Sequence, residues 1–444
     1  MASGGEITPT QLRLIRYALK PAYPSPIEGE EGHPRQLPIL AYHDPMPHEA
    51  LIDDARAIAD DIVALRRAIH AEPELGLHTP KTRDKIRAAL AHLPLEWREG
   101  PLTTGLVATL KGGAGTGRSV LLRGDMDALP MPEETGLDFA SATPGVMHAC
   151  GHDAHVAMLA GAAELLARRA DALKGEVRFM FQPGEEGWHG ARFMLEDGLL
   201  DPLPDAAFAL HVMPNAPHGL VGGRAGPLLA AADQIEIVVE GKGGHASLPH
   251  ETFDPVPVAC EIVMALQAMV TRKFNAHDPV VVTIARIEAG SAHNVIPDRA
   301  TLKGTMRSLS PGNRQRLRDE VIRLAAGIAA AHDMAARVEV LEGFPVTICD
   351  AKAVDFGEQV AQSLFGEAAF LRLAAPIMGA EDFAYVLEKV PGAMFFLGVS
   401  HEGDDWAQCC GIHSTRMMVD ESVMPQGAAY LAGLAERFLE RGFG

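Results

Sequence analysis

Short apolar segments, each followed closely by a residue that can bind a metal ion or a proton, constrain the fold of this chain most. They cover residues 119–123, before Asp125; residues 176–182, before Glu185; residues 206–210, before His211; and residues 393–397, before His413. Helix-forming stretches separate several of them, and such alternation predicts an α/β fold. Open α/β sheets place their sites at the carboxyl ends of their strands. We therefore expect these side chains to meet at one edge of a sheet.

Helix signals complete the expected larger unit. An amphipathic helix is predicted over residues 53–70. Thr79-Pro80 predicts the start of a second helix, with Thr79 as the N-cap and proline at the first helical position. Asp153 is expected to cap a long helix over residues 154–169. Residues 1–45 contain seven prolines among glycines and glutamates, and they are interpreted as an irregular N-terminal extension without visible chemistry.

The stretch from residue 230 to residue 342 follows a different order. Strands are predicted at 234–240, 280–287, 300–307 and 337–341, with helices opened by Asp254-Pro255 and Ser310-Pro311. The order β-α-β-β-α-β is the ferredoxin-like arrangement. The predicted organisation is an extension (1–45), a catalytic metal-binding domain (46–229 and 343–444) and an inserted dimerisation or lid domain (230–342).

Composition excludes several classes of function. The chain has 444 residues, of which 47% are hydrophobic and 22% charged, as in ordinary globular enzymes. A formal net charge of −19 would repel nucleic acid. No 18-residue apolar stretch and no signal-peptide pattern is present, so we expect a cytoplasmic protein without membrane contact. Five cysteines, few and odd in number, favour reduced thiols over a disulfide framework.

Two compact motifs carry potential metal ligands. M-H-A-C-G-H ends at His152 and contains Cys150, whereas Q-P-G-E-E-G carries the adjacent carboxylates Glu185 and Glu186. Thiolate, imidazole and carboxylate suit a borderline divalent metal, and one further glutamate could serve as the base of a hydrolase. The pattern therefore predicts a metallohydrolase, although a cysteine taken alone is more often a small buried hydrophobe.

Other polar residues near these motifs allow less specific interpretations. Asp125 and Asp127 could orient a metal ligand or simply hydrogen-bond their own loop. His148, His155 and His189 are interpreted as structural.

The motifs occur in order from about residue 60 to residue 435 and together resemble the M20 metallopeptidases. They are R-G-D-M-D-A-L-P, M-H-A-C-G-H-D-A-H, Q-P-G-E-E-G, H-V, G-K-G-G-H-A-S-L-P-H, N-V-I-P-D, G-T-M-R-S, M-G-A-E-D-F and G-I-H-S. The likeness is strongest to the amidohydrolase branch, with hippurate hydrolases, indole-acetyl-amino-acid hydrolases and N-acyl-amino-acid deacylases. It implies a two-metal centre, with manganese, zinc, cobalt or nickel, whose ligands are Cys150, His152, Glu186, His211 and His413.

The resemblance also implies catalytic and substrate-binding roles. Glu185 matches the general base, and His245 matches a histidine that stabilises the oxyanion in the partner subunit's site. Asn294 and Arg307 match residues that bind a substrate carboxylate. Without the resemblance, His245 would be an exposed turn residue, and Arg307 could equally be a surface residue of a strand.

The implied function is hydrolysis of the amide bond of a small N-acyl amino acid by a metal-activated water, in a homodimer or higher homo-oligomer. An M20-type dipeptidase or aminopeptidase is the alternative among enzymes. A silent metal-binding scaffold of the same fold is the alternative outside enzymes, and the presence of Glu185 argues against it.

Overall fold

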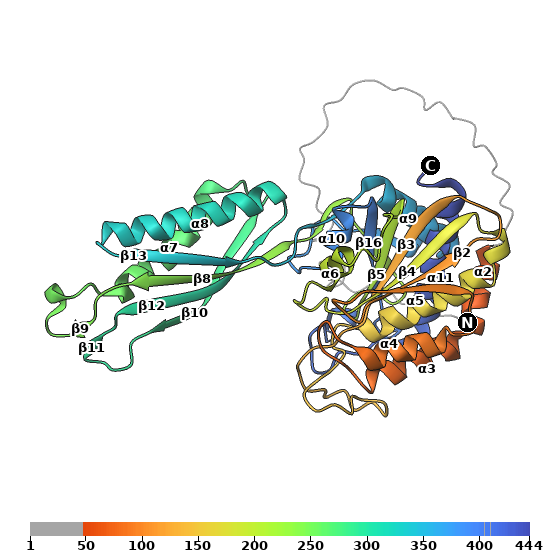
Figure 1. The fold of residues 1–444 in the computed structure, drawn as a ribbon, viewed down its shortest axis with the longest axis horizontal. Helices are drawn as coiled ribbons and strands as arrows, with labels where there is room; N and C mark the ends of the chain where they lie inside the picture. The colour runs from red at the N-terminus through yellow and green to blue at the C-terminus, as the bar shows by residue number, and fades with distance from the viewer. Residues whose placement is uncertain (1–47, 404, 409) are drawn as a thin grey trace, which may run out of the picture.

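A computed structural model describes residues 48–403, 405–408 and 410–444 and shows a large α/β part joined to a smaller, elongated part (Figure 1). The predicted extension, residues 1–45, lies outside the described residues. The large part is built on an eight-stranded sheet with the order β1-β2-β4-β3-β5-β16-β6-β15. This architecture confirms the predicted α/β class. No described helix combines the length and the apolar character needed to cross a membrane.

Parallel strands form the centre of the large sheet. β3 (Arg118–Asp125) pairs in parallel with β4 (Gly175–Gln182) and β5 (Ala206–Met213), and β5 pairs in parallel with β16 (Gly392–Gly398). The outer strands are β1 (Leu95–Glu99), β2 (Leu106–Lys111), β6 (Val221–Gly223) and β15 (Phe370–Arg372). Every predicted strand of this part is present and is slightly longer than expected. Asp125 is consequently the last residue of β3, and His211 lies two residues before the end of β5, so neither follows its strand.

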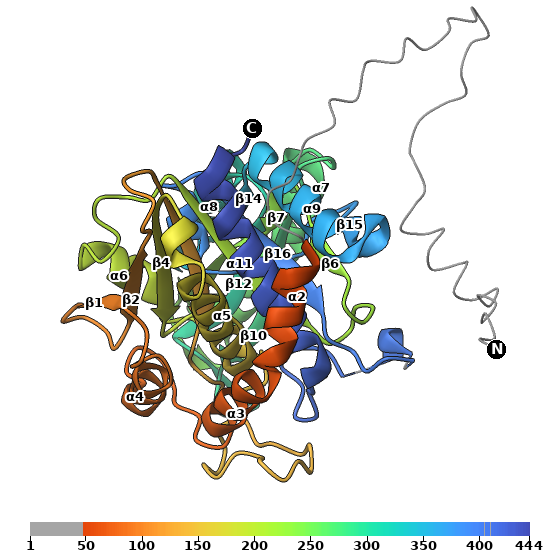
Figure 2. The ribbon, with the colours of Figure 1, turned by 90° about the vertical axis from the view of Figure 1, so that its right-hand side faces the viewer.

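Helices α2 (His48–Ala57), α5 (His152–Ala167) and α11 (Met424–Arg441) contact one another over one face of the sheet (Figure 2). The prediction of a single helix over residues 53–70 is wrong in one respect, because two helices, α2 and α3 (Ala59–His70), cover this stretch. At the division, the amide of Ile58 bonds to Ala55 O at 3.3 Å, a three-residue turn that interrupts the helical hydrogen-bond ladder.

Two predicted helix starts differ from the structure in detail. α5 begins at His152, and its N-cap is Gly151 with φ of 83°, so Asp153 lies inside the first turn and does not cap it. The Asp153 carboxylate instead binds Arg66 Nε at 2.9 Å and His70 Nδ1 at 2.8 Å. Thr79 is the N-cap of α4 (Pro80–Ala89) as predicted, but its hydroxyl lies against Thr104 and makes no capping bond.

The smaller part has the predicted β-α-β-β-α-β order. Its elements are β8 (Ala231–Glu240), α7 (Pro255–Lys273), β10 (Val280–Ala289), β12 (Arg299–Ser308), α8 (Pro311–Ala331) and β13 (Ala335–Leu341). The antiparallel sheet order β10-β12-β8-β13 is the ferredoxin-like one, and both helices pack on it around a separate apolar core. The exact domain boundaries at residues 230 and 342 remain a prediction.

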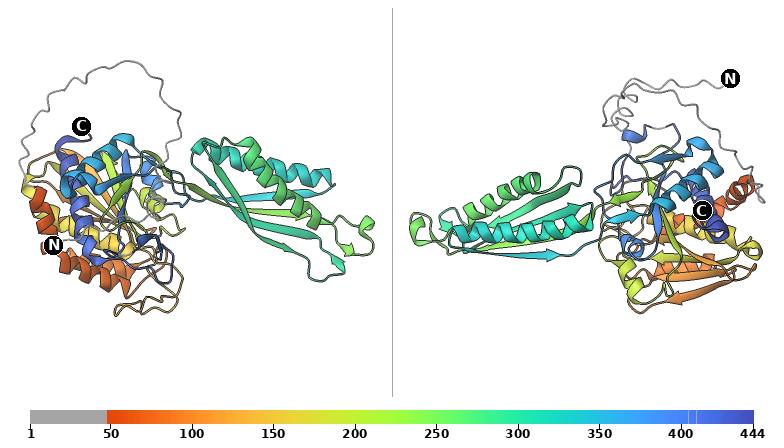
Figure 3. Two further views of the ribbon diagram at one scale, coloured as in Figure 1. Left: turned by 180° about the vertical axis from the view of Figure 1, so that it is seen from behind. Right: turned by 90° about the horizontal axis from the view of Figure 1, so that it is seen from above.

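A narrow two-stranded hinge joins the parts, and the smaller part projects away from the larger one (Figure 3). Ala232 N donates to Phe344 O at 3.1 Å, and Gly343 N donates to the Asp233 carboxylate at 3.0 Å. A Cβ at Gly343 would lie 1.9 Å from Ala232 O, so the two segments can approach this closely only with glycine there. Asp233 also binds Arg314 and Arg318, which anchors the hinge to α8.

Candidate metal centre

The six side chains that were predicted as five metal ligands and a base converge. Single ligand atoms of Cys150, His152 and His211 lie within 4.8 Å of one another, and so do those of Cys150, Glu186 and His413. A further group of this kind joins Glu185 to His152 and Glu186. The Cys150 Sγ to His211 Nε2 distance is 3.4 Å, and the His413 Nε2 to Glu186 Oε1 distance is 3.2 Å. The cluster lies where β4, β5 and β16 end and α5 begins.

Backbone carbonyls fix the tautomers of two of these histidines. His152 Nδ1 lies 2.8 Å from Asp127 O, and His211 Nδ1 lies 2.7 Å from Val212 O. A carbonyl only accepts, so each Nδ1 carries a proton. Burial would lower the pKa of His152, but the Asp125 carboxylate raises it well above its ordinary value, so a metal would have to displace the proton on its Nε2 and take that lone pair. The buried His152 Nε2 has no hydrogen-bond partner among the described residues. A buried nitrogen without a partner is costly unless a ligand binds it, so the donor set fits a divalent metal.

The electrostatics of the cluster fit the same interpretation. Burial raises the pKa of the Cys150 thiol, so the thiolate needs a compensating cation. Burial, followed by the neighbouring His155, lowers the pKa of His211 well below its ordinary value and keeps its imidazole neutral. Hydrogen bonds to Cys150 and Glu186 raise the pKa of His413 to about 10. Metal binding would displace that proton.

Asp127 holds the loop that carries Glu185 and Glu186. Its two carboxylate oxygens accept the backbone N–H groups of Glu185 at 2.9 Å and of Glu186 at 3.1 Å. Asp125 accepts from His155 Nδ1 at 2.5 Å and from Arg123 at 2.7 Å, and His155 Nε2 accepts Val212 N–H at 2.8 Å. Asp125, Asp127 and His155 therefore orient the residues of the cluster without belonging to the predicted ligand set.

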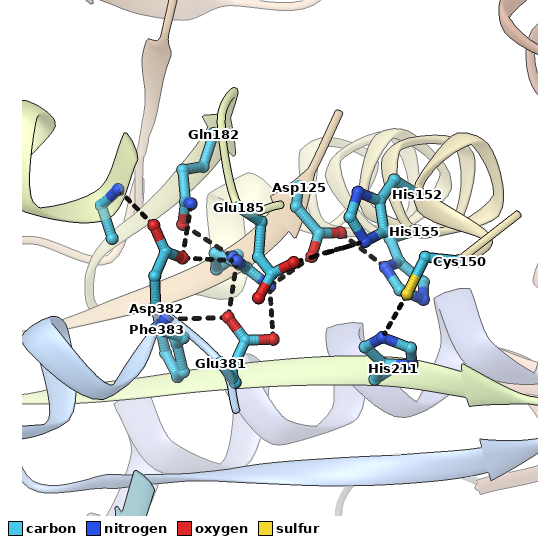
Figure 4. A network of polar contacts seen from close by, with 12 residues as sticks. Asp125, Cys150, His152, His155, Gln182, Glu185, His211, Glu381, Asp382 and Phe383 are labelled. Atoms are coloured by element: carbon cyan, nitrogen blue, oxygen red, sulfur yellow. Dashed lines mark hydrogen bonds and ion pairs between the residues drawn. The ribbon is translucent and has the colours of Figure 1, made fainter. Parts of the chain in front are cut away.

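Sequence reasoning assigned no role to a buried charge network beside Glu185 (Figure 4). Arg123 binds Glu381 at 2.9 Å and Asp382 at 3.1 Å, and Gln182 donates to Asp382 at 2.7 Å. Two features of the sequence could have predicted this network. They are an arginine inside an apolar strand and the adjacent carboxylates in the motif G-A-E-D-F. Carboxylate oxygens of Glu185, Glu381 and Asp382 lie within 4.8 Å of one another.

This network sets the proton affinity of Glu185. Burial and then the negative charge of Glu381 raise the pKa of Glu185 well above its ordinary value. Burial raises the pKa of Asp382 to about 8, against the opposing charge of Arg123. A buried carboxyl group with a raised pKa can take and return a proton near neutral pH, as a general base must.

A cavity of about 770 Å³ connects the cluster to the smaller part. Its walls include Glu185, Glu186 and His413 from the large part and Arg307 from β12. The half-buried Arg307 guanidinium has no hydrogen bond or ion pair with any described residue, and burial lowers its pKa. Arg307 is therefore available to bind an anion in the cavity.

The structure does not bring His245 and Asn294 into this cavity. His245 ends β9 (Gly244–His245), which pairs with β11 (Val295–Ile296) at the end of the smaller part farthest from the large sheet (Figure 1). Both residues are exposed, and His245 Nδ1 lies 2.8 Å from the Ser247 hydroxyl.

Comparisons with known proteins agree with this geometry. Residues 121–437 match the model of the family described as Peptidase family M20/M25/M40. The chain is 38% identical to thermostable carboxypeptidase 1 of Saccharolobus solfataricus over 394 residues, covering 88% of this chain and 98% of the relative. It is 38% identical to the N-acetyl-L-cysteine deacetylase of Bacillus subtilis, covering 85% of this chain and 88% of the relative. A solved structure from Bacillus subtilis, a dinuclear metal-binding peptidase of the M20 family, matches with a TM-score of 0.75 at 35% identity, covering 87% and 99% of the two chains.

Proposed function

The chain belongs to peptidase family M20/M25/M40, and from that premise we propose that it is a metal-dependent amidohydrolase that cleaves the amide bond of N-acyl amino acids. The observation that best supports this proposal is that Glu185, a buried carboxylate with a raised pKa, lies beside a cluster of residues able to bind metal ions. The similarity to an N-acetyl-L-cysteine deacetylase supports an N-acyl amino acid as the substrate class.

Five residues would hold two divalent ions: Cys150, His152, Glu186, His211 and His413. The two groups of three ligands that share Cys150 support a pair of ions, as does the likeness to a dinuclear metal-binding peptidase. When bound, the ions would lower the pKa of water and polarise the amide carbonyl. A mixed sulfur, nitrogen and oxygen set does not choose among manganese, zinc, cobalt and nickel.

Glu185 is assigned the proton transfers. Its carboxylate takes a proton from the attacking water and delivers it to the nitrogen of the breaking C–N bond, so that a free amine and a carboxylate leave. Asp127 holds the backbone of Glu185, and the Arg123 network restrains the carboxylates around it. The proton is thus held and released at one fixed position.

The test of this assignment is Glu185→Gln, which keeps the size of the side chain but removes the base. The rate of N-acyl amino acid hydrolysis should fall by roughly 10²- to 10⁴-fold, while the metal content stays at the wild-type level. Glu186→Gln is the matched control, because it removes a proposed ligand and should lower the metal content as well. Loss of metal from Glu185→Gln alone would exchange the two roles.

We assign Arg307 to the substrate carboxylate, and Asn294 and His245 to a site in a partner subunit. The half-buried, unpaired Arg307 supports the first assignment. The distance of β9 and β11 from their own cavity supports the second, because residues at that end can complete a site only in another copy of the chain. A homodimer is the simplest assembly that meets this requirement.

Subunit mixing tests the assignment of His245 and the dimer together. His245→Ala and Glu185→Gln proteins should each be nearly inactive, whereas their heterodimer contains one site with both groups intact. Activity should reappear on mixing, and only under conditions that allow subunit exchange. Verified heterodimers without activity would leave His245 as an exposed turn residue.

A peptidase is the second candidate, since one relative is named a carboxypeptidase. A dipeptidase or aminopeptidase must hold a free α-amine, whereas the assigned substrate has a blocked and uncharged nitrogen. Rates on N-benzoylglycine, N-acetyl amino acids and dipeptides, measured with manganese or zinc, separate the two.

A further inference from the structure

His189 follows the motif Q-P-G-E-E-G and lies at the N-cap of α6 (Gly190–Glu196) in an uncommon conformation. Its φ of 60° and ψ of 37° are left-handed, a region that few residues other than glycine adopt, with histidine among the more frequent of those that do. Such conformations cluster where function requires a fixed geometry. His189 lines the cavity together with Glu185 and Arg307, yet it belongs to none of the potential metal-binding groups in the described part of the chain.

Aromatic side chains and one hydroxyl fix the His189 ring in place. The ring packs edge-on against Phe344 of the hinge, with 5.0 Å between centroids and 89° between planes. Its Nδ1 lies 2.9 Å from Tyr385 Oη, and the same hydroxyl donates to Gly343 O at 3.3 Å. The phenol has a single hydrogen, so both contacts form together only when His189 Nδ1 is the donor to Tyr385.

His189 Nε2 is then a hydrogen-bond acceptor. Burial, and then the positive charge of Arg192, hold the pKa of His189 below its ordinary value against the opposing Glu342, so the ring is neutral at pH 7. A neutral imidazole that carries its proton on Nδ1 has a lone pair on Nε2. No described residue forms a hydrogen bond with that atom, which faces the cavity, so water or a group bound there can supply the donor.

An N-acyl amino acid with an ionised carboxylate has one N–H donor in its common part, the hydrogen on the scissile amide nitrogen. Only one carbon separates that nitrogen from the carboxylate. Arg307, the proposed carboxylate site, and His189 both border the hinge, Arg307 through the neighbouring Asp233 and His189 through Phe344. Because His189, Glu185 and Arg307 line the same cavity, a substrate whose carboxylate is bound by Arg307 can present its amide N–H to His189.

We infer that His189 Nε2 accepts the N–H of the scissile amide, and that His189 thereby orients the nitrogen that Glu185 protonates. The inference rests on the proposed function and names the chemical feature that the site selects, a secondary amide. The left-handed backbone is part of the same arrangement, because another φ would turn the ring away from Phe344 and Tyr385.

The test compares a secondary with a tertiary amide, N-benzoylglycine with N-benzoyl-N-methylglycine, on wild type and on His189→Asn. Asparagine tolerates the left-handed backbone but is too short to replace Nε2. The loss of one neutral hydrogen bond should lower kcat/KM on N-benzoylglycine by about 3- to 10-fold. The N-methyl compound has no N–H to lose, so its kcat/KM should change by less than about 2-fold.

Two further variants sharpen the comparison. Tyr385→Phe keeps the aromatic packing but removes the hydroxyl that fixes the tautomer, so it should give a smaller loss, again confined to the secondary amide. His92→Asn makes the same substitution at a histidine whose side chain is 62% exposed in the large part, and it should leave both substrates unaffected. Dissociation constants of both compounds, measured on Glu185→Gln with and without His189→Asn, repeat the test without turnover.

Equal losses on both amides, or no loss on either, would overturn the assignment of His189. Failure of the wild type to cleave N-benzoylglycine and every other N-acyl amino acid would overturn the proposed function, and this inference with it. Wild-type turnover with a loss restricted to the secondary amide supports both.

Discussion

Truncation of Arg307 should discriminate between substrates by their charge. The Arg307 side chain makes no hydrogen bond or ion pair with any described residue, and its strand pairing with Val281 and Ala232 involves only the backbone. Arg307→Ala should therefore fold normally and keep its metal. What it loses is the partner of the substrate carboxylate.

The expected loss of kcat/KM in Arg307→Ala follows from the environment of the guanidinium. A hydrogen bond to a charged group contributes about 1.5–3 kcal/mol, and a half-buried guanidinium with a lowered pKa is poorly screened by water. The loss corresponds to about 10- to 150-fold in kcat/KM for N-benzoylglycine. N-Benzoylglycinamide has no carboxylate, so its low kcat/KM should barely change.

Steady-state kinetics on the acid and on the amide, with wild type and Arg307→Ala, give the four values required. Arg307→Lys should recover part of the loss, because it restores the charge without the two-pronged geometry. Arg299→Ala is the matched control, since Arg299 is an exposed residue at the other end of β12. Equal losses on acid and amide would show that Arg307 supports the hinge or the interface, and they would refute its role in binding carboxylate.

Two further predictions concern the metal and the dependence of stability on pH. Cys150→Ser should retain less metal on dialysis against a chelator and lose activity in proportion, as measured by elemental analysis. Burial would lower the pKa of His70, but the Asp153 carboxylate raises it to about 9 from 6.5, so this pair stabilises the fold fully below pH 6.5 and loses its effect as pH rises through 9. His70→Gln should remove about 3 kcal/mol of the fall in unfolding free energy between these pH values, as urea titrations of both proteins would show.

Strand periodicity predicted the α/β class and the ferredoxin-like insertion, and ligand spacing together with the resemblance to the M20 metallopeptidases predicted the residues that gather into the cluster. Each of these depends on short stretches of chain, such as the two residues from Cys150 to His152. The topology then adds a general rule, because parallel strands such as β5 and β16 bring their carboxyl ends to the same edge.

Features that depend on contacts between distant segments were not predictable in this way. Asp153 has the composition of an N-cap, but Arg66 and His70 lie 87 and 83 residues away in sequence and bind its carboxylate instead. The Glu381–Arg123 pair spans 258 residues. His189 looked like a structural histidine because nothing in the sequence shows that Tyr385 and Phe344 fix its ring.

The close approach of the two hinge segments also bears on how the chain folds. β5 and β16 must pair although the whole smaller part separates them in sequence, and closing so long a loop is slow when the intervening chain is unfolded. Pairing of β8 with β13 brings the two ends of the insertion together within one small domain, and Ala232 then meets Phe344. The folded insertion therefore acts as a short linker between the two halves of the large sheet. It raises the effective concentration of each half for pairing with the other. Substitutions in the core of the insertion should accordingly slow refolding of the large sheet, although they touch none of its contacts.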